Sequence, residues 1–222
     1  MSQAAQHVQS TLSSQPNRVN AVWADTLESP VWPDKAVLAH AYLLAGDWDA
    51  AYRLAVPEQV LGWSSSHNTQ GLVVSCCLVQ MSGALPGQLP PNLTQLWHWE
   101  VQNSTGFVSW YGADAGEASL LVRLQDAYTE RLPEVALTRD QQATFLAWCL
   151  DVVRRRVDAI VSNQHRGSYD RAALLLTSCT EVLRFLGKAQ EARALLSDIR
   201  QQFRRHRAFQ TELQAALQRM GA

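Results

Sequence analysis

The sequence predicts an all-α protein built from stacked antiparallel helical hairpins. Three observations predict this fold: apolar residues recur at spacings of three and four, glycines interrupt the apolar stripes, and a capping pattern precedes the longest stripe. A helix has 3.6 residues per turn, so apolar residues at these spacings share one face that can be buried. Glycine permits the backbone conformation in which helices commonly end.

The N-terminal part predicts one helical hairpin and one buried helix. A helix over residues 34–45 and a second over 48–55 form the hairpin, with Gly46 in the turn between them. Residues 69–81 are strongly apolar and predict a buried helix. We therefore expect residues 1–82 to form an N-terminal helical subdomain.

The segment 83–92 contains three prolines and two glycines and is the clearest linker in the chain. It separates the N-terminal subdomain, 1–82, from a C-terminal subdomain, 93–222. Charge divides the chain as well. Residues 1–138 carry 5 basic and 12 acidic side chains, whereas residues 139–222 carry 14 basic and 8 acidic ones. The two parts therefore carry opposite net charge.

Residues 93–101 admit two interpretations. Asn92 followed by Gln95 is typical of a helix start. The alternation of tryptophan with other residues instead predicts the first arm of a short β-hairpin near 96–111. We favour the helix because the rest of the chain is helical. Residues 118–132 then predict a further amphipathic helix.

Four consecutive helices are predicted over residues 138–220. Thr138 and Gln141 form a T-x-x-Q capping box at the start of the first helix. The boundary at 204–206 contains neither Gly nor Pro, so a single bent helix is an alternative there. The four apolar stripes are Leu146, Leu150, Val153, Val157 and Ile160; Ala172, Leu176, Cys179, Leu183 and Leu186; Ala192, Leu196, Ile199 and Phe203; and Phe209, Leu213, Ala216 and Met220.

Three predicted turns share one arrangement, with Gly, a packing residue two positions later and Ala five positions later. These are Gly46-Asp47-Trp48-Asp49-Ala50-Ala51, Gly167-Ser168-Tyr169-Asp170-Arg171-Ala172 and Gly187-Lys188-Ala189-Gln190-Glu191-Ala192. The arrangement resembles the helix-turn-helix signature of tetratricopeptide-like repeats. The resemblance implies hairpins stacked as in an α-solenoid.

The order of three segments, at 156–160, 165–169 and 205–209, also resembles the helical C-terminal region of large bacterial proteins that carry a SWIM-type zinc finger. The resemblance covers residues 145–215. The chain lacks the Cys-x-Cys and Cys-x-His pairs of that finger. The resemblance therefore implies a helical accessory module, without the zinc site.

Two groups of residues are candidates for partner binding. Arg200, Arg204 and Arg207 are spaced four and three positions apart, so they would share a helix face that could contact phosphates. The alternatives are a solvated face or docking against the acidic part of the chain. The second group, which could line a groove for a peptide or a sugar, consists of Trp97, Trp99, Trp110 and Tyr111. Aromatic packing in the core is the alternative for it.

Familiar catalytic and metal-binding patterns are incomplete. His98-x-Glu100 lacks the P-C-x-x-C partner of zinc deaminases. The loop 112–117 lacks the Gly-Lys-Ser/Thr ending of a phosphate-binding loop. The cysteines Cys76, Cys77, Cys149 and Cys179 show no C-x-x-C spacing and predict reduced, buried thiols. We therefore expect neither a cofactor nor a metal ion.

The sequence as a whole predicts a non-catalytic helical-repeat module that binds a protein or peptide partner. Nucleic-acid binding through the C-terminal arginines is the alternative, and an enzyme or ligand binder with a Trp-lined pocket is a remote one. No signal peptide and no apolar run of about 20 residues is visible. We therefore expect a cytoplasmic protein without membrane contact.

Overall fold

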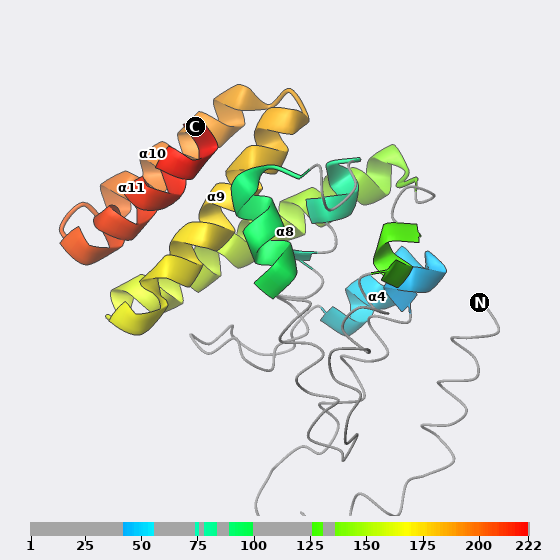
Figure 1. Cartoon of the computed structure of the whole chain (residues 1–222), viewed down its shortest axis with the longest axis horizontal. Coiled ribbons are helices and arrows are strands. Elements are labelled where there is room, and N and C mark those ends of the chain that lie inside the picture. The colour runs from blue at the N-terminus through cyan, green and yellow to red at the C-terminus, as the bar shows by residue number, and fades with distance from the viewer. Residues whose placement is uncertain are drawn as a thin grey trace, which may run out of the picture.

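The computed structural model describes residues 42–55, 74–75, 78–83, 89–99, 126–130 and 136–221. All regular structure in these ranges is helical, which confirms the all-α class for this part of the chain. Short helical segments lie at 42–45, 74–75, 78–81, 91–99 and 126–130. The longer elements are α4 (Trp48–Ala55), α8 (Arg139–Ser162), the 3-10 turn η3 (Arg166–Ser168), α9 (Tyr169–Phe185), α10 (Ala189–Gln202) and α11 (Arg207–Gly221) (Figure 1).

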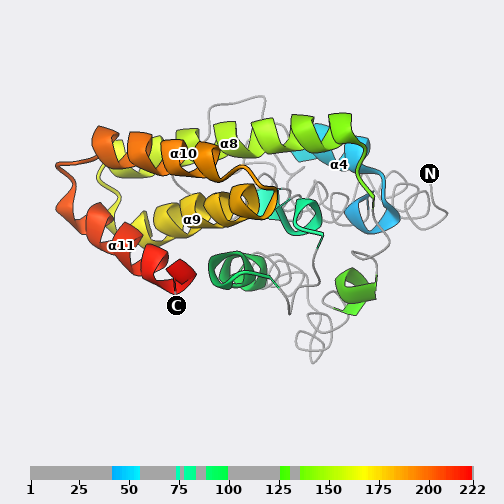
Figure 2. The ribbon, with the colours of Figure 1, turned by 90° about the horizontal axis from the view of Figure 1, so that it is seen from above.

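The four predicted C-terminal helices are present, and they run alternately in opposite directions (Figure 2). α9 is central and packs against α8, α10 and α11. Twelve of its 17 residues are buried. Its two buried threonine hydroxyls bond within the helix: Thr177 Oγ1 donates to the carbonyl of Ala173 (2.8 Å), and Thr180 Oγ1 to that of Leu176 (2.9 Å). Local hydrogen bonds thus make polar residues compatible with a central position.

The start of α8 confirms the predicted capping box. The backbone N–H of Gln141 donates to Thr138 Oγ1 (3.2 Å), and the backbone N–H of Thr138 donates to Gln141 Oε1 (3.1 Å). The first turn of a helix leaves backbone donors without intrahelical partners. The reciprocal pair supplies such partners and fixes where α8 begins.

The end of α8 differs from the prediction that Gly167 supplies the turn. The residue in the left-handed region is Gln164, with φ of 55°, whereas Gly167 lies in η3. Gln164 N–H donates to the carbonyl of Val161 (3.1 Å), in the bonding pattern of a Schellman motif. The residues at 162–166 are all polar, so further helical turns would bury no apolar side chain. α8 therefore ends before the glycine.

The other two glycine turns are confirmed. Gly46 and Gly187 each have φ of 75° and are closed by the backbone bonds of a Schellman motif. Ala51 and Ala192, five positions after each glycine, are buried. Trp48, two positions after Gly46, is buried as well. The shared arrangement thus corresponds to shared turn geometry at two of its three occurrences.

The boundary between α10 and α11 is a turn and not a bend in one helix. The rings of Phe203 and Phe209 lie edge to face at 5.8 Å, and the His206 ring lies 5.6 Å from Phe203. Gln210 Nε2 donates to the carbonyl of Phe203 (3.1 Å). Aromatic packing and this hydrogen bond hold the corner without a glycine or a proline.

α4 packs onto the first half of α8. The ring of Tyr52 lies 5.2 Å from that of Phe145 and 5.6 Å from that of Trp148. Asp47 caps α4, since its Oδ1 accepts from the backbone N–H of Ala50 (3.1 Å). Figure 1 shows α4 at the opposite end of the molecule from α10 and α11.

Residues 91–99 form a helix, hereafter helix 91–99, which overturns the β-hairpin interpretation of this segment. Proline suits the first turn of a helix because it lacks the N–H that would have no partner there. Pro90 and Pro91 therefore start a helix at the end of the predicted linker. Asn92 lies inside the helix, so the prediction that it caps the helix is wrong. The carboxylate of Glu181 caps this helix instead.

Several sequence predictions concern residues outside the described ranges. These are the helical residues expected at 34–41, the linker residues at 84–88, the second hairpin arm at 107–111, and the residues Cys76, Cys77, Trp110 and Tyr111. Within the described ranges, no helix is long and apolar enough to cross a bilayer.

Candidate functional site

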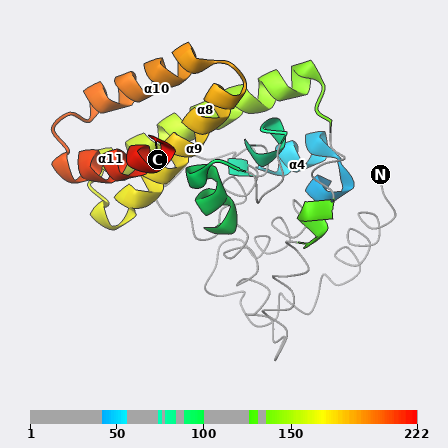
Figure 3. The ribbon, with the colours of Figure 1, turned by 45° about the horizontal axis from the view of Figure 1, so that its top comes forward.

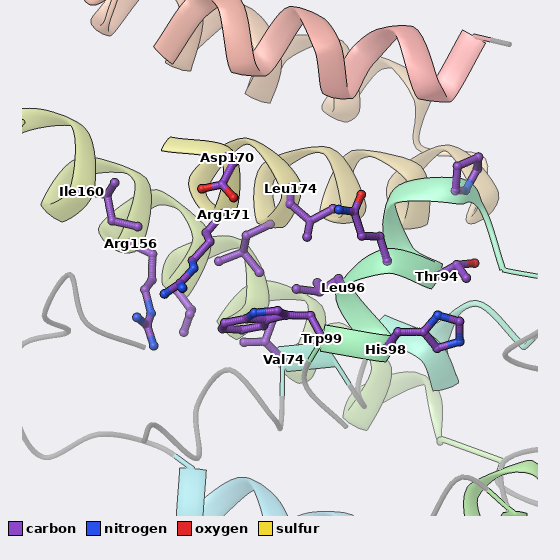
Figure 4. A pocket seen from close by; sticks show the side chains of 14 residues that line it. Val74, Thr94, Leu96, His98, Trp99, Arg156, Ile160, Asp170, Arg171 and Leu174 are labelled. Atoms are coloured by element: carbon purple, nitrogen blue, oxygen red, sulfur yellow. The ribbon is translucent and has the colours of Figure 1, made fainter. Parts of the chain in front are cut away.

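A groove of about 540 Å³ lies where helix 91–99 meets α8 and α9 (Figure 4). Each of the three helices contributes residues three or four positions apart, as neighbouring turns of one face do. The groove is lined by Val74, Pro91, Thr94, Gln95, Leu96, His98, Trp99, Val152, Arg156, Ile160, Asp170, Arg171, Leu174 and Leu175. Its volume falls within the range of sites that hold small ligands or peptide side chains.

The interior of the groove is aliphatic. Val152 and Ile160 of α8 and Leu174 of α9 are buried, and Leu175 is half-buried. These four side chains come from α8 and α9, which pack against each other. The groove is therefore an extension of the core to the surface, where apolar area can still be covered by a partner.

Trp99 and Arg171 form a cation–π pair at the edge of this aliphatic floor. The Arg171 guanidinium carbon lies 5.2 Å from the centroid of the Trp99 ring. Trp99 is half-buried and Arg171 is exposed. A pair at this distance contributes on the order of 0.5–1 kcal/mol at an exposed site. It joins the last turn of helix 91–99 to the first turn of α9.

Arg156 adds a second guanidinium to the groove. It is 3% exposed and lies four positions from both Val152 and Ile160, within the buried face of α8. Its neighbours Arg154 and Arg155 are exposed. The run of three arginines thus contains one member that faces the groove, and burial makes its charge more strongly felt by a nearby ligand than that of a solvated arginine.

Helix 91–99 is anchored by Glu181 of α9, which is 5% exposed. Glu181 Oε1 accepts from the backbone N–H of Asn92 (3.2 Å), and Oε2 accepts from that of Leu93 (2.8 Å). These are N–H groups of the first helical turn, which need acceptors from outside the helix. A carboxylate almost ninety residues away in the sequence therefore caps this helix.

The Asn92 side chain ties the same helix to α11. Its Nδ2 donates to the carbonyl of Ala216 (2.9 Å) and to Glu181 Oε1 (3.1 Å), and its Oδ1 accepts from Arg219 Nε (2.9 Å). Figure 3 shows the end of α11 in front of α9 and beside helix 91–99. The network fixes the position of the helix that forms one wall of the groove.

Burial raises the pKa of Glu181 above its ordinary value of 4.5. The hydrogen bonds from Leu93 and Asn92 and the charge of Arg184 act in the opposite direction without cancelling the effect. Desolvation penalises the charged form of a buried carboxyl, and hydrogen bonds to that form favour it. Glu181 is thus a carboxyl whose protonation is coupled to folding.

The two described cysteines, Cys149 and Cys179, are buried thiols, as the sequence predicts. Burial raises the pKa of the Cys179 thiol to about 12, while the charge of Arg154 lowers it in part. The thiolate is the reactive form of cysteine. Cys179 is therefore an inert member of the core of α9.

The structure separates the aromatic residues that the sequence groups together. Trp97 is 1% exposed, and its ring packs edge to face on that of Tyr128 at 4.8 Å, so it belongs to the core. Trp99 lines the groove. Trp110 and Tyr111 lie outside the described residues. Trp97 and Trp99 are two positions apart on a helix, so their side chains lie in different surroundings.

The predicted shared face of Arg200, Arg204 and Arg207 does not form, because the helix ends between them. Arg200 is in the last turn of α10, Arg204 is in the following turn, and Arg207 begins α11. All three are exposed, and so is Arg205. Arg200 Nη2 donates to Gln214 Oε1 (2.9 Å). The arginines gather around a corner and not along one helix.

Sequence reasoning did not identify Arg156, Arg171 and Glu181 as site residues. The sequence indicates Arg156 only weakly, because this arginine interrupts a set of otherwise apolar positions on α8. It indicates Glu181 in a similar way, because this acidic residue stands among apolar neighbours on α9. Arg171 had none, because only the arrival of helix 91–99 places Trp99 beneath it.

Among the described residues, no three His, Cys, Asp or Glu side chains are grouped so that they could hold a metal ion. Comparisons with protein-family models, with curated proteins and with solved structures find no match to this chain.

Proposed function

We propose that this chain is a non-catalytic helical interaction module that binds a peptide segment of a partner protein in the groove. The observation that carries the proposal is the composition of the groove, an aliphatic floor bordered by Trp99, Arg171 and Asp170. Apolar area provides affinity in such sites, and a few polar groups fix the orientation of the bound segment.

The helical architecture supports the same proposal. The turns at Gly46 and Gly187 share one geometry, and both are followed by buried alanines. Helical-repeat proteins stack hairpins of this kind and present grooves to their partners. In this proposal the hairpins stack as in a tetratricopeptide-like solenoid, and the groove is part of its binding surface.

Selection from a displayed library of random linear peptides on the immobilised full chain tests the proposal. Selected peptides should bind the wild-type protein and lose binding to Gln95→Trp, in which a bulky side chain obstructs the groove. Gln95 is exposed and lines the groove, so the substitution leaves the core intact. Gln190→Trp, at an exposed position of α10 outside the groove, is the matched control and should bind like the wild type. Failure to select any peptide, or equal binding to both variants, would contradict the proposal.

A second candidate function, nucleic-acid binding, is favoured by the corner between α10 and α11. Arg200, Arg204, Arg205 and Arg207 are exposed there, and none forms an ion pair with any residue that the structure describes. Exposed guanidinium groups close together can contact successive phosphates, and such binding weakens steeply with salt. We call these four residues the basic corner.

Fluorescence anisotropy of labelled single- and double-stranded DNA and RNA separates the two candidates. Binding at low salt that weakens as salt rises, and that is lost when the basic corner is changed to glutamate, would establish the second function. Gln95→Trp should leave that binding unchanged. No binding at low salt would leave the groove as the partner site.

A further inference from the structure

We infer that the ligand of the basic corner is double-stranded nucleic acid, held by its phosphates, and that Arg166 of η3 belongs to the same binding surface. The inference rests on the second candidate function, nucleic-acid binding, and specifies which form of nucleic acid the site takes. Arg166 together with the basic corner is hereafter called the basic end.

The position of Arg166 is the first argument. Gln202 Nε2 donates to Asp158 Oδ1 (3.0 Å), so the end of α10 lies beside the last turns of α8. The rings of Tyr169 and Phe209 lie edge to face at 5.9 Å, so α9 and α11 begin side by side. Figures 1 and 2 show the end of α8, the start of α9 and the corner at the same end of the bundle. Because η3 connects α8 to α9, Arg166 lies at this end as well.

The second argument is that the five guanidinium groups of the basic end are available to a ligand, since all five side chains are exposed. Arg200 donates to Gln214, but an arginine has five N–H donors, so others remain. The side chains of the other four form no hydrogen bond or ion pair with the part of the chain that the structure describes. The nearby carboxylates of Asp158, Asp170 and Glu212 therefore do not pair with them. Each guanidinium group can donate two parallel hydrogen bonds to a phosphate.

The third argument concerns the aromatic rings at this end. Tyr169, Phe203 and Phe209 are buried, and the ring of Phe209 packs on both of the others. The ring of His206 packs edge to face on that of Phe203 at 5.6 Å. Proteins that bind single strands without sequence preference stack the bases on accessible aromatic rings. Among the described residues, the aromatic rings of the basic end are instead packed on one another.

Charge density is the fourth argument. A DNA duplex carries about one negative charge per 1.7 Å of its axis, whereas one strand contributes about one per 3.4 Å. Where bases are not stacked on the protein, phosphate contacts supply the affinity, so five guanidinium groups find more partners on a duplex than on one strand. Phosphate contacts carry no sequence information. We therefore expect a preference for duplexes, of DNA or of RNA, that is independent of base sequence.

Fluorescence anisotropy of the full chain with labelled ligands over a range of salt concentrations tests the inference. The ligands are two DNA duplexes of unrelated sequence, an RNA duplex and the separated strands of each. Each duplex should bind more tightly than either of its strands at every salt concentration, and the two DNA duplexes should bind alike. With one phosphate contact for each of the five arginines, the logarithm of the association constant for duplex DNA should fall with the logarithm of the salt concentration with a slope of about −4.5.

The contribution of Arg166 is measured by its own substitution. Arg166→Gln should make the slope less steep by about 0.9, because one phosphate contact is lost. Arg193→Gln is the matched control. It lies at an exposed position in the first turns of α10, away from the corner, and should keep the wild-type slope. Thermal unfolding followed by circular dichroism should give both variants the melting temperature of the wild type.

The outcomes distinguish the inference from the second candidate function. A wild-type slope for Arg166→Gln would overturn the place of Arg166 in the surface. Tighter binding of single strands, or a preference for one of the two duplex sequences, would overturn a duplex held by its phosphates. Either result would leave nucleic-acid binding by the basic corner standing, whereas no binding of any ligand at low salt would overturn both.

Discussion

Glu181 shows at the scale of one residue how the fold uses a buried carboxylate. Its two oxygens accept backbone N–H groups from the first turn of helix 91–99, an element far away in the sequence. A capping side chain normally belongs to a residue next to the helix start. Here the capping group comes from the central helix, so one contact fixes both the start of helix 91–99 and its distance from α9.

The raised pKa of Glu181 predicts a dependence of stability on pH. The folded state holds the proton more tightly than the unfolded state, whose pKa is near 4.5. The contribution of this group to the free energy of unfolding is therefore largest below pH 4.5 and falls as the pH rises through the higher folded pKa. Urea unfolding of the wild type and of Glu181→Gln across this window measures it. The stability of the wild type relative to the variant should decline with rising pH, and a constant or increasing difference would refute the assignment.

Gln164 carries a second prediction at this scale. Its φ of 55° costs a non-glycine residue about 1–2 kcal/mol, whereas glycine loses roughly 0.5–1 kcal/mol through its greater freedom when unfolded. Gln164→Gly should therefore increase the free energy of unfolding by up to about 1 kcal/mol.

The neighbouring residue provides the control for that substitution. Asn163 has φ of −89°, and its Nδ2 donates to the carbonyl of Ala159 (2.8 Å). Asn163→Gly loses this bond and gains no relief of strain, so it should lower stability in the same thermal or chemical unfolding experiment. If both Gln164→Gly and Asn163→Gly lowered the free energy of unfolding, the turn would not be strained at Gln164.

At the scale of elements, the network around Asn92 determines the position of helix 91–99. Asn92→Ala removes hydrogen bonds to Ala216, Glu181 and Arg219 and leaves buried groups without partners. We expect a loss of about 1–3 kcal/mol in the free energy of unfolding. Hydrogen exchange of the amides of helix 91–99 should accelerate as well. Gln95→Ala, at an exposed position of the same helix, is the control and should change neither quantity appreciably; no effect of Asn92→Ala would show that the network does not hold the helix.

The sequence predicts helices well where the signal is local. The capping box at Thr138 and the glycine turn at Gly187 depend on residues within one turn of each other, and both are confirmed. The end of α8 was misplaced because Gln164 adopts a conformation that its residue type disfavours. The cap of helix 91–99 was misassigned because its acceptor, Glu181, is distant in the sequence. Non-local hydrogen bonds leave no periodic pattern to read.

Candidate sites were harder to predict than helices for the same reason. The spacing of Arg200, Arg204 and Arg207 assumes one continuous helix, and the corner at Phe203 breaks that register. The grouping of Trp97 with Trp99 assumes a common face, but on a helix these residues point in different directions. The site residue Arg171 becomes visible only when α9 and helix 91–99 lie side by side.

At the scale of the whole molecule, one central helix organises the described part of the chain. α9 contacts α8, α10 and α11, and through Glu181 it also holds helix 91–99. The groove lies where three of these helices meet, and the basic corner lies at the far end of α10. The two candidate surfaces are thus formed by different elements, so substitutions can test them independently. The division of the chain at 83–92 and its cytoplasmic location stay predictions of the sequence.

Nuclear magnetic resonance of the isotopically labelled full chain, titrated with a selected peptide, shows directly whether the peptide binds in the groove. Binding there should shift the signals of helix 91–99, of the Trp99 indole N–H and of the lining residues of α8 and α9, with the signals of the basic corner unchanged. The indole signal is assigned by its loss in Trp99→Phe. Shifts that centre on the basic corner, or that spare Trp99 while the peptide binds, would show that the groove is not the peptide-binding site.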